Sequence, residues 1–222
     1  ILAGLDRELV QGFTGSHGFA LLPGNDFTNV VAIAAGFGGA FLTVQLLRGS
    51  SARIPLAALA AVCLGAMAAA APAPNATLTA IATACPDPGW STTTVTPFSS
   101  AHKWAAAEFE GRGVYHLGAP DVLLPRGEWA VARRRVDEHA NTGCRILVLT
   151  RSSKPSDNAD GLPAARTPLC LVLLEDTVKP DAPEILSFFL EQGIDLKVIS
   201  GDHPATVAAV ARRVSIASFH WL

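Results

Sequence analysis

The sequence predicts an α/β protein in which an antiparallel sheet with helices comes first and a parallel strand–helix–strand–helix unit follows. Short strand-like segments flank a glycine-bearing loop between residues 106 and 117, which is typical of an antiparallel hairpin. Apolar strand patterns then alternate with helical patterns between residues 169 and 213, which is typical of a parallel βαβ unit. With 50% apolar and 16% charged residues, the 222-residue chain is too apolar to be intrinsically disordered.

Charge is distributed unevenly along the chain. Residues 1–100 carry three cations and four anions, whereas residues 101–222 carry 14 cations and 15 anions. The first part therefore has a composition compatible with a membrane, and the second part has that of a soluble globule. The formal net charge of −2 leaves no overall basic field, so we expect no nucleic acid among the partners.

Residues 1–61 match no pattern that assigns them a function, but residues 27–47 contain no charged side chain. A helix of 21 residues is long enough to span the hydrocarbon core of a bilayer. Arg48 and Arg53 follow it, as a cytoplasmic flank does. Glycines and polar residues weaken the hypothesis of a membrane segment, and a buried or poorly ordered Gly/Ala-rich segment is the alternative.

Two helices are expected next. Nine of the 18 residues from Ile54 to Ala71 are alanine, the strongest helix former, so a soluble or interfacial helix is predicted before Pro72. Asn75 is placed to cap a second, short helix that extends to Ala84.

The remaining elements follow from local patterns. Gly143 is the expected C-terminal stop of one helix, and the loop over residues 151–167 is rich in Ser, Pro, Asp and Asn. The predicted strands are Thr92–Phe98, Ala106–Phe109, Val114–Leu117, Arg145–Thr150, Leu169–Leu174 and Asp195–Ile199. The predicted helices are Glu128–Ala140, Ala182–Gln192 and Pro204–Arg213.

Two clusters carry candidate chemistry. Phe98, with Lys103 five residues on, can stack on a base and neutralise a phosphate, although a core position is the alternative for the ring. Asp202 follows a glycine at the carboxyl end of a predicted strand, where ligands of α/β sheets collect; it is equally suited to cap the next helix.

The other titratable residues indicate no site. The four cysteines are 22, 59 and 26 residues apart without a C-x-x-C pair, so isolated buried thiols are expected. The six histidines share no ligand spacing, so no metal site is predicted. The run Arg133–Arg135 is interpreted as a solvated helix face.

Five motifs, in this order, resemble those of the P-type ATPases, the phosphoenzyme-forming cation pumps. Residues 98–103 (F-S-S-A-H-K) resemble the family's adenine-pocket strand, and residues 118–121 (G-A-P-D) resemble its K-G-A-P-E turn. Residues 143–149 are similar to its G-x-R strand, residues 174–180 to its D-x-x-R-P hinge, and residues 199–202 (I-S-G-D) to its T-G-D. Residues 75–78 (N-A-T-L), the single short helix before Trp90 and the G-A-P-D form resemble those of a bacterial, actinobacterial-type cation pump.

The resemblance implies a domain organisation. It places a nucleotide-binding domain at residues 62–168 and a partial haloacid-dehalogenase-like phosphorylation domain at residues 169–213, with residues 214–222 as an unassigned tail. It also implies that the parent protein lies in the plasma (cell) membrane, with residues 62–213 on the cytoplasmic side.

The same resemblance implies roles for ten residues. Phe98 would stack on adenine, Lys103 would line the pocket near the ribose and phosphates, and Arg145 would reach the phosphates. Asp202 is the expected catalytic residue beside the phosphorylation site. The other residues expected at the nucleotide or the hinge are Ser99, Gly118, Ala119, Asp176, Lys179 and Gly201.

The sequence also departs from the family's pattern. It contains neither Asp-Lys-Thr-Gly-Thr, which carries the phosphorylated Asp, nor the Gly-Asp-Gly-x-x-Asn-Asp loop that holds Mg²⁺, and Leu117 stands where the lysine of K-G-A-P-E is expected. We therefore expect an ATP-binding fragment of a cation-transporting ATPase that does not pump alone, with Mg²⁺ required by the full-length parent. The alternative is a non-catalytic, membrane-associated remnant of such a pump. A free-standing phosphatase is disfavoured because D-x-D-x-T does not occur.

Overall fold

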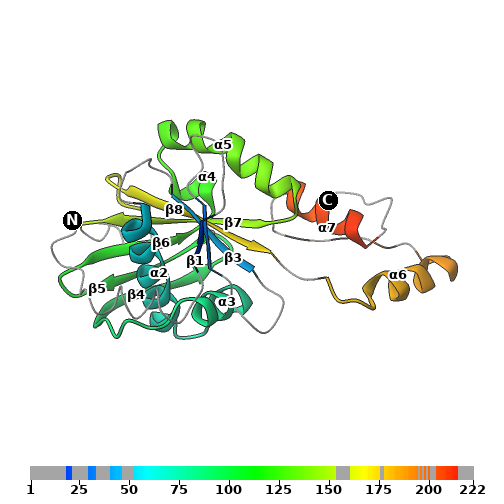
Figure 1. Cartoon of the computed structure of the whole chain (residues 1–222), viewed down its shortest axis with the longest axis horizontal. Coiled ribbons are helices and arrows are strands. Elements are labelled where there is room, and N and C mark those ends of the chain that lie inside the picture. Colours follow the sequence, from blue (N-terminus) through cyan, green and yellow to red (C-terminus); the bar gives the residue numbers. More distant parts are fainter. Residues whose placement is uncertain are drawn as a thin grey trace.

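An antiparallel sheet with helices on both faces forms the centre of the protein (Figure 1). The computed structural model describes residues 19–21, 30–33, 41–46, 53–153, 161–175, 178–194 and 204–214, together with residues 196, 198 and 200. The described strands form one eight-stranded sheet in the order β1-β2-β3-β8-β7-β6-β5-β4. All neighbouring strands in it are antiparallel.

The elements have the following bounds. The strands are β1 (Phe19–Leu21), β2 (Val30–Ile33), β3 (Phe41–Leu46), β4 (Thr92–Ser99), β5 (Trp104–Phe109), β6 (Gly113–Gly118), β7 (Arg145–Ser152) and β8 (Thr167–Glu175). The helices are α2 (Arg53–Ala70), α3 (Ala76–Ala84), α4 (Pro120–Leu123), α5 (Arg126–Asn141), α6 (Ala182–Glu191) and α7 (Pro204–Arg213).

The predicted elements between residues 54 and 150 are confirmed to within about two residues. The predicted cap at Asn75 is also confirmed, because its Oδ1 accepts a hydrogen bond from the backbone N–H of Leu78 at 3.0 Å. Gly143 has a φ of 88°, the left-handed conformation expected of a residue that ends a helix. The short helix α4 was not predicted, because its four residues are too few to show a helical period.

The expectation that the strand at Leu169–Leu174 opens a parallel unit is wrong. This strand, β8, pairs antiparallel with both β3 and β7. Its apolar run arises because both of its faces are buried: Leu171 and Leu173 face α4 and α5, whereas Cys170 and Val172 face α2 and α3. Burial on two faces produces a continuous apolar run whatever the direction of the neighbouring strands.

The rest of the expected parallel unit is described only in part. Helices α6 and α7 match the predicted helices, and α7 has the predicted bounds. Residues 195, 197 and 199 of the predicted strand lie outside the described residues, and residues 196 and 198 are not in a strand. The haloacid-dehalogenase-like interpretation and the proposed division at residues 168 and 169 therefore stay predictions.

Two apolar layers hold helices against the sheet. On one face, α2 and α3 cover a cluster that includes Phe109, Leu149 and Val172. On the other face, α4 and α5 cover a cluster that includes Leu123 and Val148. In Figure 1 the two layers lie on opposite sides of the sheet, and α6 extends away from it without a buried residue.

The N-terminal segment forms strands where it is described. Strands β2 and β3 fall inside residues 27–47, and β3 extends the sheet alongside β8. The other residues of that segment lie outside the described part of the chain. Among the described residues, no helix has the length and apolar character needed to cross a bilayer. Helix α2 continues through residue 62, the predicted start of the nucleotide-binding domain.

The four cysteines are free thiols; three are buried as expected, whereas Cys144 is half-buried. Cys63, Cys85 and Cys170 are buried, and burial raises the pKa of Cys63 and of Cys85 to about 12. A thiol with a raised pKa is a poor nucleophile at neutral pH. These cysteines therefore serve as small apolar residues in the packing of α2, α3 and β8.

Candidate functional site

A cavity of about 760 Å³ lies at one edge of the sheet, the edge formed by the ends of its strands. At this edge β4 and β6 end and β5 and β7 begin, so residues far apart in the sequence come together. The first turns of α3 and α7 and one side of α5 complete the walls. The lining residues are Asn75, Thr77, Leu78, Phe98, Ser100, Lys103, Ala105, Leu117, Gly118, Ala119, Pro120, Asp121, Trp129, Arg133, Val136, Asp137, Arg145, Ile146, Leu147, Pro204 and Thr206.

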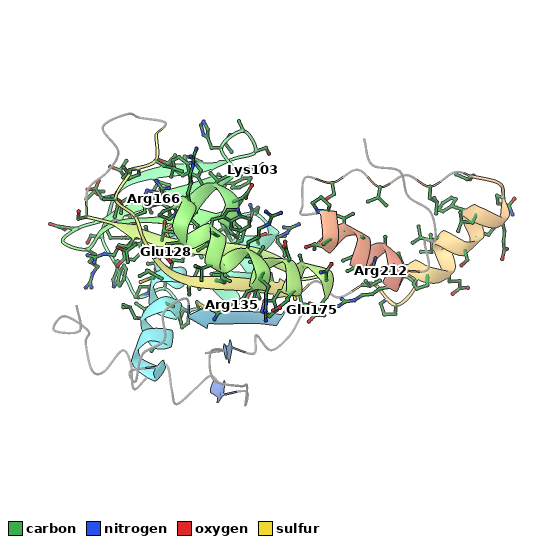
Figure 2. All side chains as sticks on the ribbon, turned by 90° about the horizontal axis from the view of Figure 1, so that it is seen from above. Lys103, Glu128, Arg135, Arg166, Glu175 and Arg212 are labelled. Atoms are coloured by element: carbon green, nitrogen blue, oxygen red, sulfur yellow. The ribbon has the colours of Figure 1, made fainter. Side chains whose placement is uncertain are left out.

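The turn between β4 and β5 supplies an aromatic ring and a cation. Phe98 is 49% exposed and lines the cavity, so it is not a core residue. Lys103 adopts a φ of 62°, and its N–H donates to the carbonyl oxygen of Ser99 at 2.7 Å. The hydroxyl of Ser99 accepts from the N–H of Ala101 at 3.2 Å. Ser99 thus shapes the turn that brings Lys103 to the edge of the sheet (Figure 2).

Gly118, the last residue of β6, allows two strands to approach closely beside the cavity. A Cβ at this position would lie 2.4 Å from the carbonyl oxygen of Lys103 and 2.6 Å from the Cα of Trp104. The N–H of Ala119 then donates to the same Lys103 oxygen at 3.0 Å. Gly118 and Ala119 therefore fix the position of the Lys103 backbone.

Arg145, the first residue of β7, contacts a hydroxyl partner on α3 at the cavity wall. Its Nη1 donates to the Oγ1 of Thr77 at 3.0 Å. Thr77 is held there because Asn75 caps the N-terminus of α3. Arg145 and Thr77 are both half-buried, so the guanidinium is partly shielded from water at the cavity wall.

The polar lining has an excess of positive charge. Lys103, Arg133 and Arg145 are its cations, and Asp121 and Asp137 are its anions. The Nε of Arg133 lies 3.8 Å from the Oδ2 of Asp137, so the charges of these two side chains offset each other. The first turns of α3 and α7 add the partial positive charge of helix N-termini. The remaining lining is apolar, so the cavity combines an apolar wall with a surface suited to an anion.

Helix α7 is attached to the sheet by polar contacts near the cavity. The Oγ1 of Thr206 donates to the carbonyl oxygen of Cys144 at 2.8 Å. The Nη2 of Arg213 lies 2.9 Å from the Oε1 of Glu175, the last residue of β8. Figure 2 shows Glu175 at the end of β8 that faces α7. Through these contacts, α7 closes one side of the cavity.

The structure brings together five of the ten residues assigned by resemblance. Phe98, Lys103, Gly118, Ala119 and Arg145 all line the cavity. Their roles toward a nucleotide stay predictions.

The other five are placed differently. Ser99 is not in the lining, where its neighbour Ser100 takes its place. Lys179 is exposed and precedes α6, away from the lining. Asp176, Gly201 and Asp202 lie outside the described residues.

Sequence reasoning missed several lining residues. Thr77 and Trp129 carry no motif that links them to a nucleotide, and their place depends on how α3 and α5 pack. The solvated face expected at Arg133–Arg135 fits the side chains of Arg133 and Arg134, which are 69% and 88% exposed, but Arg133 also borders the cavity. The i,i+4 spacing of Arg133 and Asp137 was the one sequence signal here, and it indicates an ion pair on a single face of the helix.

Comparison with known proteins identifies the class. The chain is 43% identical over 154 residues to "Calcium-transporting ATPase CtpE" of Mycobacterium tuberculosis. The matched region covers 69% of this chain and 19% of the relative. It is 41% identical over 145 residues to the protein of the same name in Mycolicibacterium smegmatis, covering 64% of this chain and 18% of the relative. It is 38% identical over 125 residues to "Probable cation-transporting ATPase exp7" of Streptococcus pneumoniae, and this match covers 56% of this chain and 15% of the relative. No family model matches the chain.

These relatives define a class of ATP-driven cation transporters. The chain belongs to the P-type cation-transporting ATPases, as its motifs predicted. It spans about a fifth of the length of the relatives that it matches.

Proposed function

We propose that the cavity binds ATP, with the adenine beside Phe98 and the phosphates toward Lys103 and Arg145. The observation that carries this proposal is the meeting of an exposed aromatic ring and these two cations in one cavity. Aromatic rings stack on bases, and lysine and arginine side chains bind phosphate oxygens. A cavity of about 760 Å³ also falls within the range of small-molecule sites.

In the whole protein, this part would hold ATP for a cation pump. We propose that Asp176, Lys179, Gly201 and Asp202 belong to the hinge and to the phosphoryl-transfer site of that pump, and that the pump resides in the plasma membrane with this part on the cytoplasmic side. Phosphoryl transfer requires a nucleophilic carboxylate and charge-neutralising groups in one place. Because the sequence contains no Asp-Lys-Thr-Gly-Thr, this chain alone would bind ATP without forming the phosphoenzyme.

Mg²⁺ is expected in the parent protein, but the described residues do not form a site for it. No three carboxylate, histidine or cysteine side chains among them are grouped to hold a metal ion. Two carboxylates, Asp121 and Asp137, line the cavity, and Asp137 is close to Arg133.

Replacing Phe98 by alanine tests the proposal. We expect Phe98→Ala to weaken ATP binding about tenfold, because base stacking contributes about 1–3 kcal/mol by alanine substitution. Isothermal titration calorimetry on the 222-residue chain measures the change. Phe188→Ala is the matched control, because that ring is 56% exposed on α6 and does not line the cavity. Equal affinities in the two variants would refute the placement of the adenine.

A further inference from the structure

We propose that the C-terminal segment, residues 215–222, docks on the apolar face of α6, which consists of Ala182, Ile185, Leu186 and Phe189. The segment reads S-I-A-S-F-H-W-L, with four large apolar side chains and no Asp, Glu, Lys or Arg. It lies outside the described residues, and the family's motifs leave it unassigned. This docking gives the segment a partner within its own chain, and it does not depend on whether the cavity binds ATP.

Helix α6 exposes a large part of its apolar surface. None of its ten residues, all of which the structure describes, is buried. Ile185, Phe188 and Leu190 are about half exposed, and Phe189 is 37% exposed. The rings of Phe188 and Phe189 lie edge to face, with their centroids 5.9 Å apart. Contiguous apolar surface marks an interaction site, whereas single exposed apolar side chains need no explanation.

The apolar face of α6 continues a contact that the chain already makes. Val214, the residue that precedes the segment, is buried in a cluster against which Ala182 and Leu186 pack. Ile185 and Phe189 each follow one of these two residues by three positions, and residues three apart lie on one side of a helix. The chain therefore leaves α7 beside the apolar face of α6, and Figure 2 shows the two helices next to each other.

The length and the attachment of the segment favour it over a second copy of the chain. Helix α6 has 10 residues and is therefore about 15 Å long. The eight residues of the segment extend about 26–29 Å as a strand and about 12 Å as a helix, so either form reaches along most of the face. Because the segment is tethered beside the face, its effective concentration is on the order of millimolar. A second copy at micromolar concentration competes poorly with such a partner.

The segment also matches the face in chemistry. Glu184 and Glu191, the carboxylates of α6, lie about half a turn around the helix from Ala182. The apolar face therefore carries no charge, and the docking of an uncharged segment buries none. Phe219 and Trp221 supply large apolar side chains, whose removal from water favours the contact. An acidic or basic partner would lose the hydration of its charges without gaining an opposite charge.

Hydrogen exchange of the α6 amides, measured by mass spectrometry, tests the docking in the 222-residue chain. We expect a variant truncated after Val214 to lose about 10- to 100-fold of the protection of these amides, because apolar burial on α6 is lost. We expect Trp221→Ala to lose about tenfold. Ser218→Ala is the matched control, because it changes the segment without removing an apolar side chain, and it should keep the protection of the wild type.

The fluorescence of Trp221 reports on the same contact from the other partner, and it decides the question if the truncated chain does not fold. Subtracting the spectrum of Trp221→Phe isolates the emission of this indole. We expect Phe189→Ser to shift this emission to longer wavelength, because the indole then meets water, and Glu191→Gln to leave it unchanged. Equal protection of α6 with and without the segment, or an emission that Phe189→Ser does not shift, would overturn the proposal. Protection that rises with protein concentration, together with a dimer in sedimentation, would assign the face to a second copy and overturn it as well.

Discussion

Replacing Arg145 by alanine is expected to weaken ATP binding about 10- to 100-fold, while adenosine binding stays unchanged. Hydrogen bonds to charged groups contribute about 1.5–3 kcal/mol, and the cavity places this guanidinium beside Thr77 with part of its surface shielded from water. Because adenosine carries no phosphate, its affinity reports on the adenine side of the cavity alone. Calorimetry with both ligands separates the two effects.

Two further variants make this prediction specific. Arg151→Ala removes an equal charge from the same strand, but Arg151 bonds to the carbonyl oxygen of Arg112 and lies over the ring of Tyr115, outside the lining. We expect it to keep the affinity for ATP. Arg145→Lys keeps the charge without the planar fork, so we expect an intermediate affinity. Equal losses in Arg145→Ala and Arg151→Ala would indicate a general effect of charge and contradict the assigned role.

Replacing Gly118 by alanine is expected to lower the free energy of unfolding by about 1–3 kcal/mol. The added Cβ would meet the backbone of Lys103 and Trp104 at 2.4–2.6 Å, and backbone atoms in a paired strand cannot move away cheaply. For a chain of this size, each kcal/mol lowers Tm by about 2–4 °C. Urea unfolding followed by circular dichroism measures the change.

Gly127→Ala is the matched control for this variant. Gly127 lies in α5 and has no atom within 4 Å of the added Cβ, so the substitution should be neutral or stabilising by about 0.5–1 kcal/mol. An unfolding free energy for Gly118→Ala equal to that of the wild type would show that β5 and β6 do not approach as closely as the structure has them.

Local patterns in the sequence predicted most elements, because the signals are short-range. Asn75 as a helix cap, the alanine-rich α2 and the hairpin glycines each act within a few residues. Pairing direction is different: β8 has an apolar run because helices cover both faces, and that run carries no information on the direction of β3 or β7. The parallel unit was therefore expected at a strand that belongs to the antiparallel sheet.

The site was predicted in part, for a related reason. The sequence contains recognisable motifs that include Phe98, Lys103, Gly118 and Arg145. The sheet brings these four residues together in the cavity. Thr77 and the first turn of α7 join the cavity through tertiary packing, which no local pattern encodes.

Direct titration of ATP into the 222-residue chain by calorimetry tests the central claim, that this cavity binds an adenine nucleotide. We expect saturable binding at one site, with ATP bound more tightly than adenosine because phosphates meet the excess positive charge of the lining. A folded chain, verified by circular dichroism, that gives no saturable heat at about 10 mM ATP would contradict the claim, because affinities weaker than about 1 mM correspond to less than about 4 kcal/mol of binding free energy. That result would favour a non-catalytic remnant of a cation pump instead.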